Sequence, residues 1–164
     1  MLSRSHVLEE TKKNAFEEKE RELRGNNFII YRVPEASSAD DKGKQDKLFC
    51  MELIRDALEV DAQESDIKKI FRLGKKDTAV RPILVQLRER SIKNRVMESL
   101  FKLKDCDDKF KNVSVTHDLT QQERIECKAL VAEAKKRQDD EKGEWLWRVR
   151  GVPGLMKVIR IPRN

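Results

Sequence analysis

The side chains with the most evident chemistry in this sequence are its lysines and arginines, which gather in two blocks. From Asp66 to Lys104 the chain has twelve Lys or Arg against four Asp or Glu, a local charge of +8. From Trp145 to Asn164 it has five and no acid, a local charge of +5. Because the net charge is only +6, the rest of the chain is acidic. Phosphate binding depends on local charge, so the blocks predict a polyanion-binding surface; solvated helix faces are the alternative.

Residues that could catalyse a reaction or hold a metal are few. The sequence has no GxSxG, P-loop or HExxH pattern. Its histidines are His6 and His117, and a single histidine at a strand end is more often solvated or capping than a base. Cys50, Cys106 and Cys127 are odd in number and lack CxxC spacing. We therefore expect no enzyme, no metal site, no cofactor and no disulfide framework.

Composition narrows the class of protein further. The chain has 164 residues, enough for one ordinary domain or two small ones, with 40% charged and 5% aromatic residues. No apolar run approaches the ~20 residues that span a bilayer, and residues 1–10 lack the apolar core of a signal peptide. These features predict an intracellular protein with reduced cysteines and no membrane partner.

Residues 8–24 form a polar segment that is rich in Glu, Lys and Arg and free of Pro and Gly, which predicts a helix ending at Gly25. Its apolar seam is thin, because only two pairs of apolar residues recur at a spacing of seven: Leu8 with Ala15, and Phe16 with Leu23. A helix so polar is marginal alone. We interpret residues 1–25 as the end of a longer coiled-coil helix for oligomerisation, with a frayed terminal helix as the alternative.

Residues 26–118 alternate between strand and helix patterns. Short β-branched and aromatic segments predict strands at 28–33, 67–73, 81–88 and 113–116. Helical spacing of apolar residues predicts helices at 47–60 and 91–104, and Cys50 falls on the apolar face of the first. The order β-α-β-β-α-β is the ferredoxin-like pattern, an antiparallel sheet with two helices on one face. In RRM modules, the other face of such a sheet binds single-stranded RNA.

Residues 119–164 predict a second, smaller unit. Thr120 and Glu123 fit a capping box that begins a helix running to about Asp139. Strands at 145–150 and 155–161 flank the Gly-Val-Pro-Gly segment at 151–154, which is typical of a β-hairpin. The fold class is therefore α+β. One helix and one hairpin are too small to be stable alone, so they must dock on the first unit or on a partner.

Four segments in a fixed order carry a family resemblance. They are FEEKERELRGNN running into FIIYRVPE, then DIKKIFRLGKK, RPILVQLR and VSVTHDLTQQER. Over residues 12–161 the chain resembles the first-open-reading-frame proteins of LINE-type (non-LTR) retrotransposons. The resemblance implies a coiled-coil trimer with an RRM and a small C-terminal domain. It also implies binding of single-stranded RNA with little sequence preference, packaging of the element's transcript, and nucleic-acid chaperone activity.

The same resemblance implies a location in cytoplasmic ribonucleoprotein particles with access to the nucleus, and single-stranded DNA as a further ligand. An alternative from another class is an RRM-like protein-interaction or oligomerisation module without intrinsic RNA binding. The two basic blocks disfavour this alternative, whereas the scarcity of aromatic residues on the strands favours it.

Strand alternation predicts which side chains face away from the helices. The inward positions are Phe28, Ile30 and Val33. The outward positions are Ile29, Tyr31, Pro82, Leu84 and Gln86. A sheet with one tyrosine cannot stack several bases, so we expect affinity to come mainly from cations on phosphate. Tyr31 would add one stack worth ~1–3 kcal/mol, with a plain surface residue as the alternative.

The predicted nucleic-acid site combines Tyr31 with basic residues placed by the resemblance and by the hairpin. Those of the connection between the second and third strands are Arg72, Lys75, Lys76 and Arg81. Those on or just after the second helix are Lys93, Arg95, Lys102 and Lys104, and those on the last helix are Arg124 and Lys128. The hairpin adds Arg148, Arg150, Lys157 and Arg160. Trp145 and Trp147 are assigned to the core of the small unit, with base stacking as the alternative.

Overall fold

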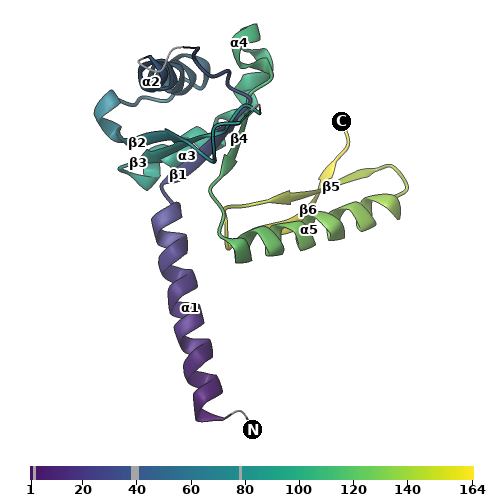
Figure 1. Cartoon of the computed structure of the whole chain (residues 1–164). Coiled ribbons are helices and arrows are strands. Elements are labelled where there is room, and N and C mark those ends of the chain that lie inside the picture. Colours follow the sequence, from purple (N-terminus) through teal and green to yellow (C-terminus); the bar gives the residue numbers. More distant parts are fainter. Residues whose placement is uncertain (2, 38–40, 78) are drawn as a thin grey trace. The chain divides into compact units, whose positions relative to one another are not determined.

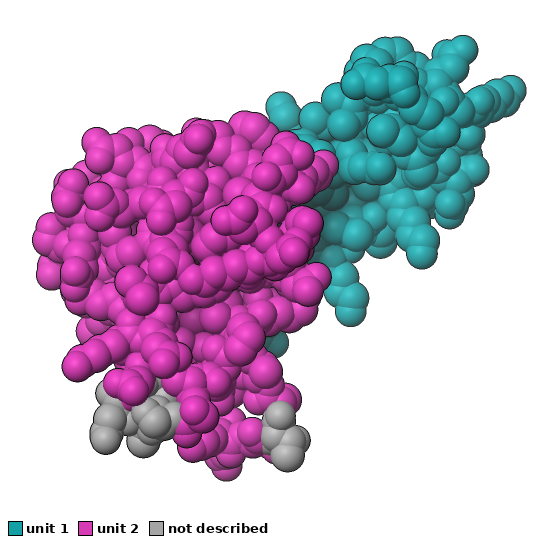
Figure 2. Space-filling model, turned by 90° about the horizontal axis from the view of Figure 1, so that it is seen from above, with its two compact units in different colours: residues 1–21, 119–164 teal, residues 22–118 magenta. Residues whose placement is uncertain are grey.

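The computed structural model describes residues 1, 3–37, 41–77 and 79–164, with only the backbone of Lys42. The chain divides into two compact units, coloured separately in Figure 2. Unit 1 consists of Met1–Arg21 and Leu119–Asn164, and unit 2 is Glu22–Asp118. The N-terminal segment groups with the C-terminal region, and the division falls inside the first helix.

Unit 2 is built on a four-stranded antiparallel sheet. Its strands are β1 (Asn27–Tyr31), β2 (Ile67–Arg72), β3 (Ile83–Leu87) and β4 (Ser114–His117). Their order is β2-β3-β1-β4, so β1 is central and pairs Phe28 with Val85 of β3 and Ile30 with Val115 of β4. The four predicted strands are confirmed. The predicted basic connection at 74–80 contains residue 78, which lies outside the described residues.

Helical segments cover one face of this sheet (Figure 1). They are α2 (Lys42–Glu52), which continues into the π-helix η1 (Leu53–Ala57), then the 3₁₀ turn η2 (Glu64–Asp66), α3 (Arg90–Glu98), the 3₁₀ helix η3 (Leu100–Asp105) and α4 (Asp108–Lys111). The predicted helix at 91–104 is therefore α-helical only to Glu98, and α4 was not predicted. Phe28, Leu53 and Val96 are fully buried between sheet and helices.

Cys50 belongs to this core, as its position on the apolar face of the helix predicts. Its side chain has no exposed surface. Burial, with a smaller contribution from the charge of Asp46, raises the pKa of the Cys50 thiol to about 12. The thiol is therefore protonated at neutral pH and is not a nucleophile.

Unit 1 joins α1 (Arg4–Arg24, up to residue 21) to α5 (Gln121–Asp139) and to a hairpin of β5 (Trp145–Arg150) and β6 (Lys157–Pro162). The hairpin pairs Arg150 with Lys157 next to its turn, where Gly151 adopts a φ of +119°. A Cβ at Gly151 would lie 2.7 Å from the carbonyl oxygen of Leu155, so glycine is required there. The predicted hairpin is confirmed.

The junction of α1 and α5 is polar. The predicted capping box is present, because Thr120 Oγ1 accepts from the Glu123 amide at 3.1 Å and Glu123 Oε2 accepts from the Thr120 amide at 3.0 Å. Thr120 Oγ1 also donates to Glu17 Oε1 at 2.5 Å, and Arg21 Nε lies 2.9 Å from the same Glu17 oxygen. No described residue of α1 is buried, and Phe16 is 67% exposed.

Candidate nucleic-acid interface

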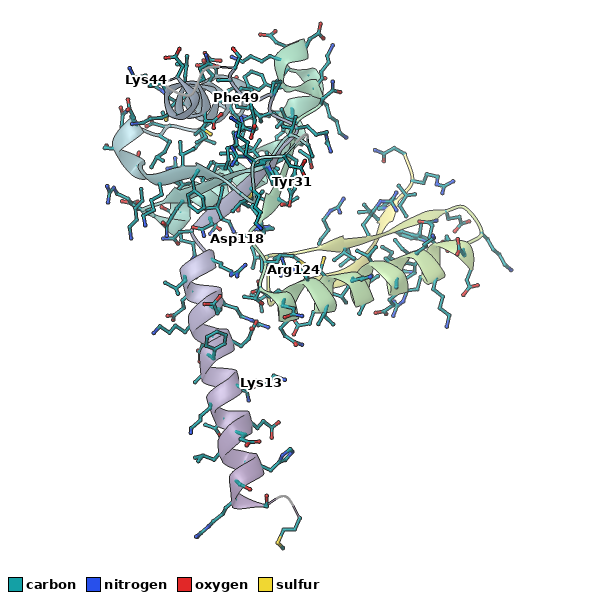
Figure 3. All side chains as sticks on the ribbon, in the orientation of Figure 1. Lys13, Tyr31, Lys44, Phe49, Asp118 and Arg124 are labelled. Atoms are coloured by element: carbon teal, nitrogen blue, oxygen red, sulfur yellow. The ribbon has the colours of Figure 1, made fainter. Side chains whose placement is uncertain are left out.

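The face of the sheet opposite the helices carries two exposed aromatic side chains. The strand register places Phe71, Leu84, Ile29 and Thr116 in one row across β2, β3, β1 and β4. Tyr31 lies two residues further along β1, where Figure 3 labels it. Phe71 is 47% and Tyr31 37% exposed, whereas Leu84 is 8% exposed. The open face thus exposes two aromatic rings, from β2 and β1, on which bases could stack.

Phe71 is the functional candidate that simple alternation misses. Ile67 and Ile70 both pack against the core although they are three residues apart, because a β-bulge shifts the register between Ile67 and Lys69. Past the bulge, Phe71 and Lys69 both point to the open face, where their cross-strand partners are Leu84 and Gln86. Counting alternate residues from Ile67 would place Phe71 toward the core, whereas counting from Ile70 places it on the open face.

Arg72, predicted to contact nucleic acid, has a different environment. Its side chain is 7% exposed, and Nε and one terminal nitrogen donate to the two carboxylate oxygens of Asp46 at 2.9 and 2.6 Å. Further donations reach carbonyl oxygens of Val33, Pro34 and Arg81 at 2.7–3.0 Å. The guanidinium therefore fixes the chain segments around the end of β2 and does not face solvent.

Two other predicted cations also point into the protein. Arg81 Nε donates to Glu35 Oε1 at 2.7 Å, and its side chain is 20% exposed. Lys93 is 4% exposed, and its Nζ lies 2.7 Å from His117 Nδ1. Burial, and secondly the charge of Lys93, lowers the pKa of His117 to about 4, so the imidazole is neutral and can accept this hydrogen bond. Lys93 is thus a structural residue.

The remaining predicted cations of unit 2 lie at its surface in two settings. Lys75 and Lys76 are exposed in the connection between β2 and β3, and Arg95 and Lys104 are exposed as well. Lys102, in contrast, donates to Glu59 Oε2 at 2.8 Å on the helical side. The structure adds one cation that the prediction omitted: Lys69, exposed and paired with Gln86, on the open face itself.

The cations of unit 1 lie on α5 and on the hairpin. Arg124 and Lys128 are exposed and four residues apart, so they share a face of α5; Figure 3 labels Arg124. Arg148, Arg150 and Lys157 are exposed on one face of the hairpin. Arg160 lies on the other face, with its guanidinium carbon 4.6 Å from the centre of the Trp145 ring.

Both tryptophans are half-buried, so neither lies fully in a core nor is fully exposed for base stacking. The guanidinium of Arg137 from α5 lies 5.0 Å from the Trp147 ring, and Gln138 of α5 accepts from the Trp147 amide at 2.9 Å. Trp147 therefore packs against α5. Its indole Nε1 is buried and has no hydrogen-bond partner among the described residues.

No protein-family model matches the chain, and no curated protein matches it. Among the described residues, no helix combines the length and the apolar character that spanning a bilayer demands. The same residues hold no group of three or more His, Cys, Asp or Glu side chains arranged to bind a metal ion.

Proposed function

We propose that this protein binds single-stranded RNA, with unit 2 acting as an RRM-like module. The observation that carries the proposal is the open sheet face, where Tyr31 and Phe71 expose aromatic rings and Lys69 exposes a cation. The strand order β2-β3-β1-β4, with helices on the opposite face, is that of the ferredoxin-like pattern, whose open face binds RNA in RRM modules.

The composition of this face favours binding with little sequence preference. Each aromatic ring can stack one base of any identity, worth ~1–3 kcal/mol. The exposed cations nearby, Lys69, Lys75 and Lys76, suit phosphate rather than base edges. Sequence reading requires several directed hydrogen bonds to bases. The register places four neutral polar side chains on this face, Asn27, Gln86, Ser114 and Thr116, and Asn27 is buried and donates to Asp118.

Unit 1 supplies a second cationic surface on the same chain. Arg148, Arg150 and Lys157 form one exposed face of the hairpin, and Arg124 and Lys128 one face of α5. Once an RNA strand is held by unit 2, its capture by unit 1 becomes intramolecular, which raises the overall affinity without tight local contacts. Because each phosphate contact is weak, bound RNA strands can exchange rapidly, which a nucleic-acid chaperone needs.

The resemblance to LINE-type first-open-reading-frame proteins supports a wider proposal. In it, the protein packages a retroelement transcript into cytoplasmic ribonucleoprotein particles and acts as a nucleic-acid chaperone. The exposed apolar residues of α1, among them Phe16 and Leu23, are then the contact surface of a coiled-coil trimer.

The test is fluorescence anisotropy with a labelled 20-nucleotide oligouridylate, and with single-stranded DNA and duplex RNA of the same length. We expect the single strands to bind in preference, with affinity falling steeply between ~50 and ~200 mM salt. Y31A and F71A should each weaken binding, whereas F101A, which removes an exposed ring on the helical side, should not. Affinity that is independent of salt would instead support the protein-interaction alternative.

A further inference from the structure

The helical side of unit 2 holds a cavity of about 430 Å³, which the proposed RNA interface does not use. Its lining comes from the end of η1 and Glu59 after it, from η3 and the two residues that follow it, and from Phe110 of α4. The volume lies within the ~300–1,000 Å³ of sites that take small ligands or a large side chain. The cavity is therefore large enough to receive part of a partner molecule.

The floor of the cavity is apolar. Ala57 and Phe110 are 7% and 6% exposed, and the Phe110 ring packs on Phe49 at 5.3 Å between ring centres. At the rim, Phe101 is 68% exposed although it is a large aromatic residue. An apolar floor with an exposed ring beside it favours a large apolar or aromatic side chain as the guest.

The rim of the cavity is acidic, although the chain as a whole carries a net positive charge. Asp56, Glu59, Asp105 and Asp107 line the cavity against one cation, Lys102. Lys102 Nζ is already bound to Glu59 Oε2 at 2.8 Å and to the Leu58 carbonyl at 3.4 Å. The lining therefore carries a charge of −3, whereas the whole chain carries +6. Such a rim repels a nucleic-acid backbone and attracts a cationic partner.

We propose that this cavity docks a basic peptide segment of a protein partner, which inserts one large aromatic side chain between Phe101 and Phe110 and places arginines or lysines on the acidic rim. Charge complementarity favours this occupant, because Asp56, Asp105 and Asp107 are exposed carboxylates that attract a cationic partner and disfavour RNA. The cavity lies on the helical side, so the protein can hold RNA on the open sheet face and this peptide at the same time. The inference goes beyond the proposed function and does not depend on it.

The probe is a fluorescein-labelled heptapeptide with a central tryptophan flanked by three arginines on each side. Matched peptides carry alanine in place of the tryptophan, or glutamates in place of the arginines. We expect the full chain to bind the arginine–tryptophan peptide at least tenfold more tightly than either matched peptide. Equal binding of the tryptophan and alanine peptides would overturn the proposal, because attraction would then be non-specific.

Two variants locate the site. D56K/D105K reverses two exposed carboxylates of the rim, and we expect at least a tenfold loss of peptide affinity. D139K/D140K makes the same change in net charge on exposed residues of unit 1, and we expect less than a twofold loss. Equal losses in the two variants would contradict a site at the cavity. F101A should weaken binding of the tryptophan peptide and leave the alanine peptide unchanged.

RNA binding and self-association are measured on the same proteins. We expect oligouridylate to bind D56K/D105K at least as tightly as the parent chain, which also shows that the variant is folded. Failure of RNA binding by the parent would refute the proposed function without affecting the peptide result. A dimer in sedimentation that F101A abolishes would assign the cavity to another occupant and overturn the proposal.

Discussion

The guanidinium of Arg72 and the carboxylate of Asp46 form a nearly buried two-bond pair, with N–O distances of 2.9 and 2.6 Å and side-chain exposures of 7% and 9%. The pair joins the end of β2 to α2. Arg72 also donates to the carbonyl oxygens of Val33 and Pro34, which follow β1. One side chain thus fixes three segments of unit 2, which a cation facing RNA would not do.

The substitution R72A should therefore lower the stability of the fold and should not act by removing a phosphate contact. Removing one member of a buried pair leaves the other charge uncompensated, which costs ~3–5 kcal/mol. We expect urea denaturation to show a fall of that size in the free energy of unfolding. K47A, which breaks the exposed pair between Lys47 of α2 and Glu64 of η2, should cost less than ~1 kcal/mol. If R72A unfolds like the parent chain but loses RNA affinity, Arg72 is a phosphate contact after all.

The double variant K75A/K76A should show the opposite behaviour. Both lysines are exposed in the connection between β2 and β3, so stability should change by less than ~0.5 kcal/mol. Each lost phosphate contact lowers the slope of log affinity against log salt by ~0.7 for single strands. We expect weaker oligouridylate binding and a shallower slope. The matched control K44A/R55A removes two exposed cations from the helical side and should leave the slope unchanged.

Sequence patterning predicted the strands, the hairpin and the capping box because each depends on local periodicity or on spacing of a few residues. It could not predict which cations face solvent, since that depends on tertiary partners: Asp46 for Arg72 and His117 for Lys93. Phe71 was missed for another reason: outward positions were assigned only on the first and third strands, and a bulge after Ile67 changes which residues of β2 face the core. Charge density therefore predicted where basic residues gather but not which of them face solvent.

The contact between Lys93 and His117 predicts a stability change at acid pH. The folded-state pKa of His117 is about 4, below the ordinary 6.5, because burial and the Lys93 charge disfavour the imidazolium. The unfolded chain then binds more protons than the folded chain between these pH values. The stabilisation is therefore complete above pH ~6.5 and is lost as the pH falls toward ~4, by about 2–3 kcal/mol.

The variant H117Q measures this contribution, because glutamine can accept from Lys93 but does not titrate. Carboxylates also titrate below pH 5, so the informative quantity is the difference between parent and variant in urea denaturation from pH 7 to pH 4. We expect the parent to lose more stability than H117Q over this range. Parallel curves for the two proteins would show that His117 titrates alike in both states. The NMR shift of the His117 ring provides a direct check.

Residues 22–118 should fold without unit 1, and the fragment should bind RNA more weakly than the full chain. The cluster of buried apolar side chains lies wholly within unit 2, whereas Ala134 is the one buried apolar residue among the described residues of unit 1. Ending the fragment at Asp118 keeps its carboxylate bonded to Arg24 at 3.1 Å and to Asn27 at 2.9 Å. We therefore expect one cooperative urea transition.

The fragment lacks the exposed cations of α5 and of the hairpin, so its affinity for oligouridylate should fall at least tenfold and its salt slope should decrease. In the full chain, R148A/R150A/K157A should reproduce part of this loss, because these three side chains share one exposed face of the hairpin. If the fragment binds as tightly as the full chain, the hairpin cations are only a solvated face. Unit 1 would then be a packing unit in which Trp147 anchors the hairpin to α5 through Arg137 and Gln138.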